Sequence, residues 1–307
     1  MIYTITANPS IDYVLQLDKM NVGEVNRTKS DVKLPGGKGV NVSRILNELA
    51  LQSTALGFVG GATGQMFENL LQQHQLKTSF TQVKDDTRIN VKINAVKQNE
   101  ETEINGTGPE ITDLEKEQFL NQLKSVGQGD VVIMSGSLPK NVETTFYLDI
   151  AKMIQEQGAD FVIDTTGQAL LDTLPLHPLV VKPNNHELAD LFNTTFKDEQ
   201  DIVENARKLL DKGAKHVLVS MAGDGALLVT NDKVFKANAP KGTVINSVGA
   251  GDSMIAGFVG TFMKTNDPIE SFHIGAACGS ATAFSQDIAI KSKIDEVYQA
   301  INITEVN

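Results

Sequence analysis

One stretch decides the fold that this chain is expected to adopt: Asn246-Ser247-Val248-Gly249-Ala250-Gly251-Asp252-Ser253. Two glycines flank an alanine, a carboxylate follows at once, and a mostly apolar run continues to Met263. The pattern predicts a tight loop that leads into a helix. Gly249 and Gly251 let backbone amides approach an anion, and the helix start adds unpaired N–H groups. An acid here suits a base that takes a proton from a nucleophile attacking a bound phosphate.

Upstream of this stretch, apolar runs alternate with helical patterns from about residue 112. Strands are predicted at 130–137, 160–165, 179–184 and 216–220, and helices at 113–124, about 143–157 and 199–211. Near-continuous apolar strands separated by helices are typical of a parallel sheet covered by helices on both faces. Each strand ends in small or polar residues, where an open α/β sheet places its ligands.

The first third of the chain contains two extended regions that interrupt this order. Strands are predicted at 2–6 and 54–59, with a loop at 60–64 before a helix at 65–73. The extended regions, 12–35 and 87–107, have alternating patterns that indicate half-exposed antiparallel strands. We expect an α/β fold with a doubly wound, mostly parallel sheet. Its core would comprise 1–11, 36–86 and 108–307, and 12–35 with 87–107 would form a small β-sheet lid.

Composition excludes several classes of function. The chain has 307 residues, 27 basic and 38 acidic, so its net charge of −11 argues against nucleic-acid or anionic-membrane partners. The single cysteine, Cys278, excludes an intrachain disulfide and a thiolate metal cage. The run from Met254 to Met263 is roughly half the ~20 residues that span a bilayer, and the first residues do not resemble a signal peptide. We therefore expect a cytoplasmic protein.

A second glycine cluster opens the helix that follows residue 36. Gly36-Gly37-Lys38-Gly39 can hold a phosphate or a polyol against backbone amides, with Lys38 as a point charge. It is not a Walker A loop, because Val40 and Asn41 follow the lysine. The alternative is a tight strand-to-helix turn, although such a turn needs fewer glycines. Asp12, at the end of the first unit, is either a turn residue or a ligand for sugar hydroxyls.

The segment after the predicted strand at 179–184 supports two interpretations. Asn184 can cap the helix that begins near Glu187, with Glu187 completing a capping box. The same carboxylate and amide can also organise hydrated Mg²⁺ beside a polyphosphate. Similarly, the turn Ser220 to Gly225 is either a hairpin or a small-residue wall for a purine. Cys278, in a small-residue helix, is interpreted as a packing residue along a ligand wall.

With these pieces in order, the chain resembles the ribokinase/PfkB family of carbohydrate kinases along nearly its whole length. Two motifs carry the resemblance: Gly36-Gly37-Lys38-Gly39-Val40-Asn41 with Gly57-Phe58-Val59-Gly60 and Gly64 downstream, and the stretch 246–253. The chain is most similar to the hexose-phosphate kinases of that family. Further matching runs are Thr6-Ala7-Asn8-Pro9-Ser10-Ile11-Asp12, Thr87-Arg88-Ile89-Asn90, Ser135-Gly136-Ser137-Leu138-Pro139 and Lys182-Pro183-Asn184.

The resemblance implies a role for each matching position. Asp252 matches the general base, and the amides of Gly249, Ala250 and Gly251 match the anion hole for the γ-phosphoryl group. Substrate positions are matched by Asp12, Arg27, Gly37, Lys38, Asn41, Arg88, Asn90 and Ser137. Nucleotide positions are matched by Lys182, Asn184, Ser220, Ala222, Gly223, Gly225, Ser247 and Cys278. Glu187 matches a Mg²⁺ ligand that acts through water.

The expected activity is ATP-dependent phosphorylation of D-fructose 1-phosphate at its C6 hydroxyl, with Mg²⁺, in a homodimer that pairs through its lids. Tagatose 6-phosphate or fructose 6-phosphate are alternative substrates within the same family. A non-catalytic ATP or sugar-phosphate sensor is an alternative of another class, although it would have no use for Asp252. A dinucleotide oxidoreductase is excluded because no Gly-x-Gly-x-x-Gly follows the first strand.

Overall fold

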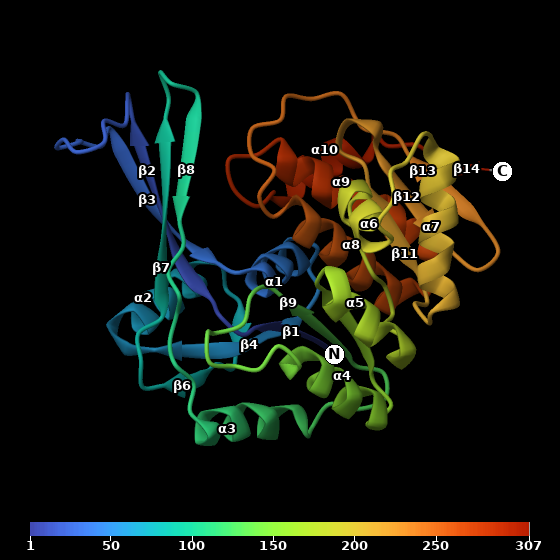
Figure 1. Cartoon of the computed structure of the whole chain (residues 1–307), viewed down its shortest axis with the longest axis horizontal. Coiled ribbons are helices and arrows are strands. Elements are labelled where there is room, and N and C mark those ends of the chain that lie inside the picture. The colour runs from blue at the N-terminus through green and yellow to red at the C-terminus, as the bar shows by residue number, and fades with distance from the viewer. Residues whose placement is uncertain (307) are drawn as a thin grey trace.

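A parallel sheet forms the middle layer of the protein, which the computed structural model describes over residues 1–306 (Figure 1). Its strands run in the order β10 (Asp160–Asp164), β9 (Val131–Ser135), β1 (Ile2–Thr6), β4 (Ser53–Gly60) and β5 (Lys77–Thr78), and β6 (Thr81–Val83) also pairs with β4. Because β1 lies between β4 and β9, the chain builds one half of the sheet and then returns to build the other. This confirms the doubly wound fold and puts the switch point beside β1.

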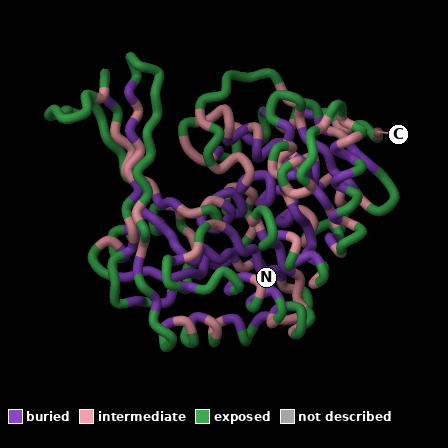
Figure 2. The backbone as a smooth tube through the Cα atoms, in the orientation of Figure 1, coloured by how far each residue is buried: buried purple, intermediate pink, exposed green. Residues whose placement is uncertain are grey.

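Helices cover both faces of this sheet. One core cluster contains Val132 and Met134 with side chains from α3 (Asp113–Leu123), α4 (Phe146–Glu156), α5 (Gly167–Thr173), α6 (Asn185–Leu191) and α7 (Glu199–Asp211). The other contains Val131 and Ile133 with side chains from α1 (Lys38–Glu48), α8 (Ala250–Thr265), α9 (Pro268–Ala283) and α10 (Lys291–Tyr298). Successive residues of β9 thus face opposite layers, as the period of a strand requires. The purple backbone of Figure 2 marks this buried interior.

The strand at 216–220 bridges the segment 179–184 in parallel, as expected, through Val181–Val217 and Asn184–Ser220. On its other side begins a four-stranded antiparallel sheet, which the sequence did not indicate. It consists of β11 (Val217–Ser220), β12 (Ala226–Val229), β13 (Val234–Ala237) and β14 (Ile303–Val306). The predicted strand at 179–184 forms only isolated bridges. Its Leu179 N donates to Phe161 O at 2.8 Å and Val181 N to His216 O at 3.1 Å, so it links the two sheets. Pro183 has no N–H to donate, but its carbonyl accepts from Ser220 N at 3.2 Å, and Asn184 then bridges Ser220.

The predicted loop at 60–64 is also different in the structure, where α2 (Gly61–Gln73) begins at once after β4. The glycines serve close packing rather than a loose turn. A Cβ on Gly60 would lie 2.1 Å from Val83 O, and one on Gly61 would overlap the Asp86 carboxylate. The glycines at 60 and 61 therefore reflect a lack of space for side chains at the start of α2, and not a loop.

A small four-stranded sheet stands away from the core, at the left of Figure 1. Its order is β3 (Ser30–Gly36), β2 (Ser10–Leu17), β7 (Arg88–Ala95) and β8 (Glu100–Ile104). β2–β3 and β7–β8 are antiparallel, but β2 and β7 pair in parallel, with Asp12 opposite Asn90. The two extended regions thus meet in one sheet, as expected, and we keep their division from the core at 12–35 and 87–107 as a proposal.

The helices are short relative to a bilayer. The longest, α8 and α9, have 16 residues each, against the ~20 that a spanning helix needs. Among residues 1–306, no helix has the length and apolar character to cross a membrane.

Candidate active site

Asp252 lies in the first turn of α8, directly after the glycine loop. Gly249 is the N-cap with a φ of +80°, a conformation that favours glycine, and Ala250, Gly251 and Asp252 follow it into the helix. The Ala250 N–H already donates to Ser247 O at 3.2 Å. The anion-binding amides that the loop offers are therefore chiefly those of its two glycines.

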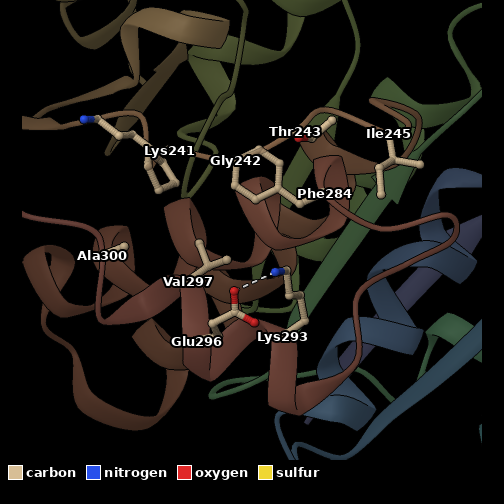
Figure 3. A pocket seen from close by; sticks show the side chains of 10 residues that line it. Lys241, Gly242, Thr243, Ile245, Phe284, Lys293, Glu296, Val297 and Ala300 are labelled. Carbon is tan, nitrogen blue, oxygen red and sulfur yellow. Dashed lines mark hydrogen bonds and ion pairs between the residues drawn. The ribbon is translucent and has the colours of Figure 1, made fainter.

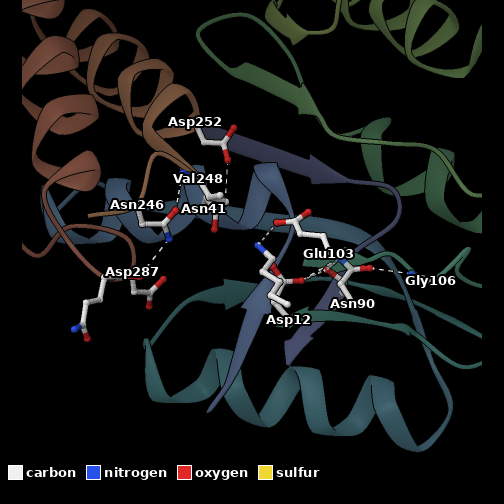
Figure 4. A network of polar contacts seen from close by, with 12 residues as sticks. Asp12, Asn41, Asn90, Glu103, Gly106, Asn246, Val248, Asp252 and Asp287 are labelled. Carbon is white, nitrogen blue, oxygen red and sulfur yellow. Dashed lines mark hydrogen bonds and ion pairs between the residues drawn. The ribbon is translucent and has the colours of Figure 1, made fainter. Parts of the chain in front are cut away.

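The Asp252 carboxylate is buried, with 5% exposed, and is oriented by α1. Asn41 Nδ2 donates to its Oδ2 at 2.9 Å (Figure 4). Burial and the nearby Asp164 carboxylate raise the pKa of Asp252 to about 6, although Asn41, Lys38 and Lys182 act in the opposite direction. A carboxylate with this pKa is mostly ionised at pH 7 and more basic than an exposed one, which suits a general base.

Two lysines surround this carboxylate. Lys38 Nζ donates to Asp164 Oδ2 at 2.8 Å, so the first residue of α1 is tied to the carboxyl end of β10. Burial lowers the pKa of Lys38, but the carboxylates of Asp164, Asp252 and Glu187 act in the opposite direction, and the pKa is raised overall. Lys182 Nζ lies so close to Gly251 that a Cβ there would be 2.9 Å from it. Both cations favour an anion at the start of α8.

A polar network lies on the small sheet near the start of β2, around Asp12 and Asn90 (Figure 4). Asp12 Oδ1 accepts from Ser10 Oγ at 2.7 Å and from Asn90 Nδ2 at 3.1 Å, and its Oδ2 lies 3.1 Å from Lys92 Nζ. Asn90 Oδ1 accepts from Gly106 N at 3.1 Å. The network fixes Asp12 and Asn90, two of the predicted substrate residues, in one arrangement.

The glycine cluster at 36–39 brings this network against α1. A Cβ on Gly36 would lie 2.4 Å from Asp12 Oδ1, and one on Gly37 would lie 2.5 Å from Thr6 Cγ2. Gly37 also has a φ of +125° at the N-cap of α1. The turn interpretation and the ligand interpretation are thus compatible, because the glycines allow the small sheet to approach the helix that holds Lys38 and Asn41.

Arg88, at the start of β7, organises the loops around the carboxyl end of the sheet. Its guanidinium donates to Asn8 O at 3.2 Å, to Gly106 O at 3.1 Å and to Ser137 Oγ at 3.3 Å. These three bonds place the predicted ligand Ser137 beside Arg88.

Several of the predicted nucleotide residues lie at the carboxyl ends of the segment 179–184 and of β11. Asn184 and Glu187 form the predicted capping box, with both backbone-to-side-chain bonds at 2.8 Å. Ser220 bridges Asn184 and leads into the 3₁₀ turn η2 (Ala222–Asp224), so the predicted hairpin is present as well. Neither the capping box nor the hairpin assigns a ligand to these residues, because contacts within the protein account for both.

A pocket of about 270 Å³ lies next to the approach to the glycine loop (Figure 3). Gly242, Thr243 and Ile245 line one side and Phe284, after α9, lines another. Ser247, a predicted nucleotide ligand, lies between this pocket and Gly249 in the chain and is exposed.

Two predicted ligands are not brought to this site. Cys278 is completely buried in α9. Its Sγ lies against α8, where a Cβ on Gly257 would be 3.0 Å from it. It therefore packs between α8 and α9, which agrees with the packing interpretation. Arg27 is exposed in the segment between β2 and β3, which joins them at the end of the small sheet opposite Asp12.

Sequence reasoning missed several residues of the site. Asp164 lies near the end of the predicted strand at 160–165, so its place at the carboxyl edge of the sheet could have been inferred from the sequence. Lys92 lies on the same face of β7 as Arg88 and Asn90, because side chains two residues apart in a strand share a face. The buried Arg44 of α1, which pairs with Asp287 at 2.5 and 3.0 Å, carried no local signal.

The family model described as pfkB family carbohydrate kinase matches residues 5–293. The chain belongs to this family. As a pfkB kinase it transfers a phosphoryl group to a sugar phosphate, and ATP is the co-substrate that the family implies.

Individual relatives agree with the family. The kinase is 45% identical to a 1-phosphofructokinase of Bacillus subtilis over 100% of both chains, and 38% identical to a D-tagatose-1-phosphate kinase of Bacillus licheniformis, again over 100% of both. Among solved structures, a putative phosphofructokinase from Staphylococcus aureus is 41% identical with a TM-score of 0.90, covering 100% of this chain and 99% of that one.

Substituting Gly249 with alanine should lower kcat by up to about 100-fold, because small misplacements of reacting groups have effects of that size. The new Cβ would lie 2.6 Å from Ile288 Cδ1 and 3.4 Å from Asn41 Nδ2, at a φ that alanine rarely adopts. Steady-state rates check this, with Gly127→Ala as the control because its Cβ would meet nothing within 4 Å. Equal rates for the two variants would contradict the role of the loop.

Proposed function

We propose that this kinase phosphorylates D-fructose 1-phosphate at its C6 hydroxyl with ATP, giving fructose 1,6-bisphosphate and ADP. One observation carries the proposal: a buried carboxylate, Asp252, held by Asn41 at the N-terminus of α8 and beside Lys182. The sugar preference rests on the full-length similarity to a 1-phosphofructokinase.

In the proposed reaction, Asp252 takes the proton of the sugar hydroxyl as its oxygen attacks the γ-phosphorus. The bond to the β-phosphate oxygen breaks, and ADP leaves with that electron pair. The amides of Gly249 and Gly251, with Lys182 beside them, stabilise the charge on the transferred group. The Asp12 network holds the sugar, and closure of the small sheet would exclude water.

Mg²⁺ fits the residues present only as a hydrated ion. Within residues 1–306, no group of three or more His, Cys, Asp or Glu side chains could hold a metal by itself. Mg²⁺ is usually bound through one or two carboxylates, waters and substrate phosphates. Glu187 accepts from Asn184 N through Oε2, and we propose that its other oxygen, with Asp164, orients the waters of an ion that neutralises polyphosphate charge.

A single assay distinguishes the substrates and the alternative class. ADP release should be fastest with fructose 1-phosphate, compared with tagatose 1-phosphate, tagatose 6-phosphate, fructose 6-phosphate and unphosphorylated fructose. Faster turnover of a tagatose phosphate or of fructose 6-phosphate would move the proposal to that substrate. ATP binding without turnover of any sugar would favour a sensor.

We also propose a homodimer that pairs through the small sheets. One face of this sheet carries Tyr13, Ile89, Val91 and Ile104, and both Ile89 and Ile104 are exposed. An apolar sheet face of this kind is typical of an interaction surface. Sedimentation equilibrium should give twice the mass of one chain, and a monomer at micromolar concentration would reject the pairing.

The pH dependence of kcat/KM follows from the pKa of Asp252 near 6. Only the ionised carboxylate accepts a proton, so kcat/KM for the sugar should rise with pH through about 6 and level off above it. The hydrogen bond from Asn41 lowers the pKa, so Asn41→Ala should move the rise to higher pH. Phosphate monoesters also ionise near pH 6, but their titration would not respond to Asn41→Ala. An unmoved profile would assign the rise to the substrate.

A further inference from the structure

Asn105 and Gly106, directly after β8, form the one Asn-Gly pair in the sequence. Asn105 is exposed to solvent. In an Asn-Gly pair, the backbone nitrogen of the glycine can attack the side-chain amide carbon of the asparagine, because glycine has no Cβ to shield that nitrogen. The backbone after β8 is therefore a chemically labile point of the chain.

Packing on the sugar side of the site requires a glycine at this position. A Cβ on Gly106 would lie 2.9 Å from Ile89 O and 3.1 Å from Arg88 Cβ. The carbonyl of Gly106 accepts from Arg88 Nη1 at 3.1 Å, and its N–H donates to Asn90 Oδ1, also at 3.1 Å (Figure 4). The residue that makes Asn105 labile is thus the one to which Arg88 and Asn90 are attached.

Asn90 restrains the nitrogen that would react. This nitrogen can attack only after it has left its hydrogen bond and lost its proton to solvent. Asn90 is 7% exposed, and its Nδ2 donates to Ser10 Oγ at 3.0 Å and to Asp12 Oδ1 at 3.1 Å. Its Oδ1 is therefore held in place against Gly106 N, and attack requires a local opening of this network.

We propose that Asn105–Gly106 is a site of spontaneous backbone modification, which the bond to Asn90 slows and which weakens sugar binding once it has occurred. The deprotonated Gly106 N forms a bond to Asn105 Cγ. The bond from Cγ to the side-chain nitrogen breaks, and that nitrogen leaves as ammonia with the electron pair and a proton from solvent. Water then opens the resulting succinimide at one of its two carbonyls, giving aspartate or isoaspartate.

Isoaspartate changes the backbone as well as the charge. The chain then continues through the former side-chain carbon, so one more carbon atom separates the 105 Cα from Gly106 N. Gly106 has no room to move toward Ile89 O or Arg88 Cβ. It therefore loses the positions from which it binds Asn90 and Arg88, whereas the α8 end of the site keeps its own contacts.

Incubation at pH 8, followed by mass spectrometry of the peptide that contains Asn105, tests the modification without any turnover and so independently of the proposed function. We expect replacement of NH₂ by OH to accumulate at Asn105 and not at Asn246, whose amide is bound to Gln286 O and Val248 N. The chain unfolded in urea gives the unrestrained rate. Modification only in urea, or equally at Asn105 and Asn246, would overturn the site.

Two variants test the restraint by Asn90. Asn90→Ala should be modified about fivefold faster than wild type, the factor that corresponds to a lost hydrogen bond of about 1 kcal/mol. Ser10→Ala is the matched control, because it removes a hydroxyl from the same network but no bond of Gly106, and it should be modified at the wild-type rate. A wild-type rate in Asn90→Ala, or the same acceleration in both variants, would overturn the restraint.

The effect on binding rests on the proposed function and is measured on the same incubated samples. As isoaspartate accumulates, kcat/KM for fructose 1-phosphate should fall in proportion, by about 10-fold or more when modification is complete, the value of a hydrogen bond to a charged group. Asn105→Gln keeps an exposed amide but would have to form a six-membered ring, so its kcat/KM should stay constant. An equal decline in Asn105→Gln would overturn the link to binding.

Freshly prepared Asn105→Asp separates the backbone change from the charge. It carries the new carboxylate without the additional backbone atom, so its KM for fructose 1-phosphate should stay within about twofold of wild type, as for other exposed charges. A loss as large as that of the incubated wild type would overturn the backbone explanation, because the charge alone would then account for it.

Discussion

Asp252→Asn should lower kcat by about 10²- to 10⁴-fold, the usual contribution of a general base, with little change in KM for ATP. The amide has nearly the same shape, so Asn41 can still donate to it and the glycine loop keeps its support. What is lost is the ability to accept the hydroxyl proton. Steady-state kinetics with saturating ATP and sugar phosphate give the answer, and activity near wild type would reject Asp252 as the base.

The same substitution should stabilise the fold at alkaline pH. The pKa of Asp252 is raised from 3.8 to about 6, so the folded state binds the proton more tightly than the unfolded state. Burying the ionised carboxylate then has a cost that is absent below pH 3.8 and complete above about pH 6. The difference corresponds to at most about 3 kcal/mol in the free energy of unfolding.

Urea unfolding at pH 8 and at pH 4 measures this gain. Asp252→Asn should be more stable than wild type at pH 8, and the difference should nearly vanish at pH 4. Asp232→Asn is the control, because Asp232 is exposed between β12 and β13. Lower kcat together with higher stability is a combination that damage to the fold would not produce.

Arg88→Ala should raise KM for the sugar phosphate by about 10- to 100-fold, with a smaller change in KM for ATP. Arg88 joins Asn8, Gly106 and Ser137, and Gly106 N in turn binds Asn90. Its loss would release the loops that hold the sugar side of the site and remove a positive charge from it. The α8 end of the site would keep its contacts.

Arg88→Ala should also lower the melting temperature, since two backbone carbonyls lose their donor. Arg88→Lys keeps the charge but cannot span three acceptors, so it should recover only part of the affinity. Arg207→Ala, on the exposed side of α7, controls for loss of an arginine. An unchanged KM for the sugar phosphate in Arg88→Ala would remove Arg88 from the substrate site.

Local patterns determined most of the elements. The apolar runs at 2–6, 130–137 and 160–165 are strands of the parallel sheet, and both glycine clusters open helices. These signals are readable because strand period, helix capping and glycine tolerance depend on residues close together in the chain. The acid after Gly251 is one such signal, since the first turn of a helix is set by its neighbours.

Register and partners were decided only by the tertiary structure. The pattern at 216–220 is that of a buried strand. Its antiparallel pairing with 226–229, and the place of 303–306 at the far edge of that sheet, depend on packing that no local period encodes. Cys278 similarly had the surroundings of a ligand wall in sequence but is enclosed between two helices.

The glycine loop and its acid were thus determined by the sequence itself, as an anion-binding turn that leads into a helix. What only the folded chain decided is the chemistry of that acid. Asn41, 211 residues away, orients the Asp252 carboxylate, and burial raises its pKa to about 6. The Lys92 contacts to Asp12 and Glu103 arise in the same way, because strand pairing joins β7 to segments on either side of it in the chain. Hydrogen bonds, burial and charge between distant segments depend on how those segments pack, and a one-dimensional pattern does not contain that information.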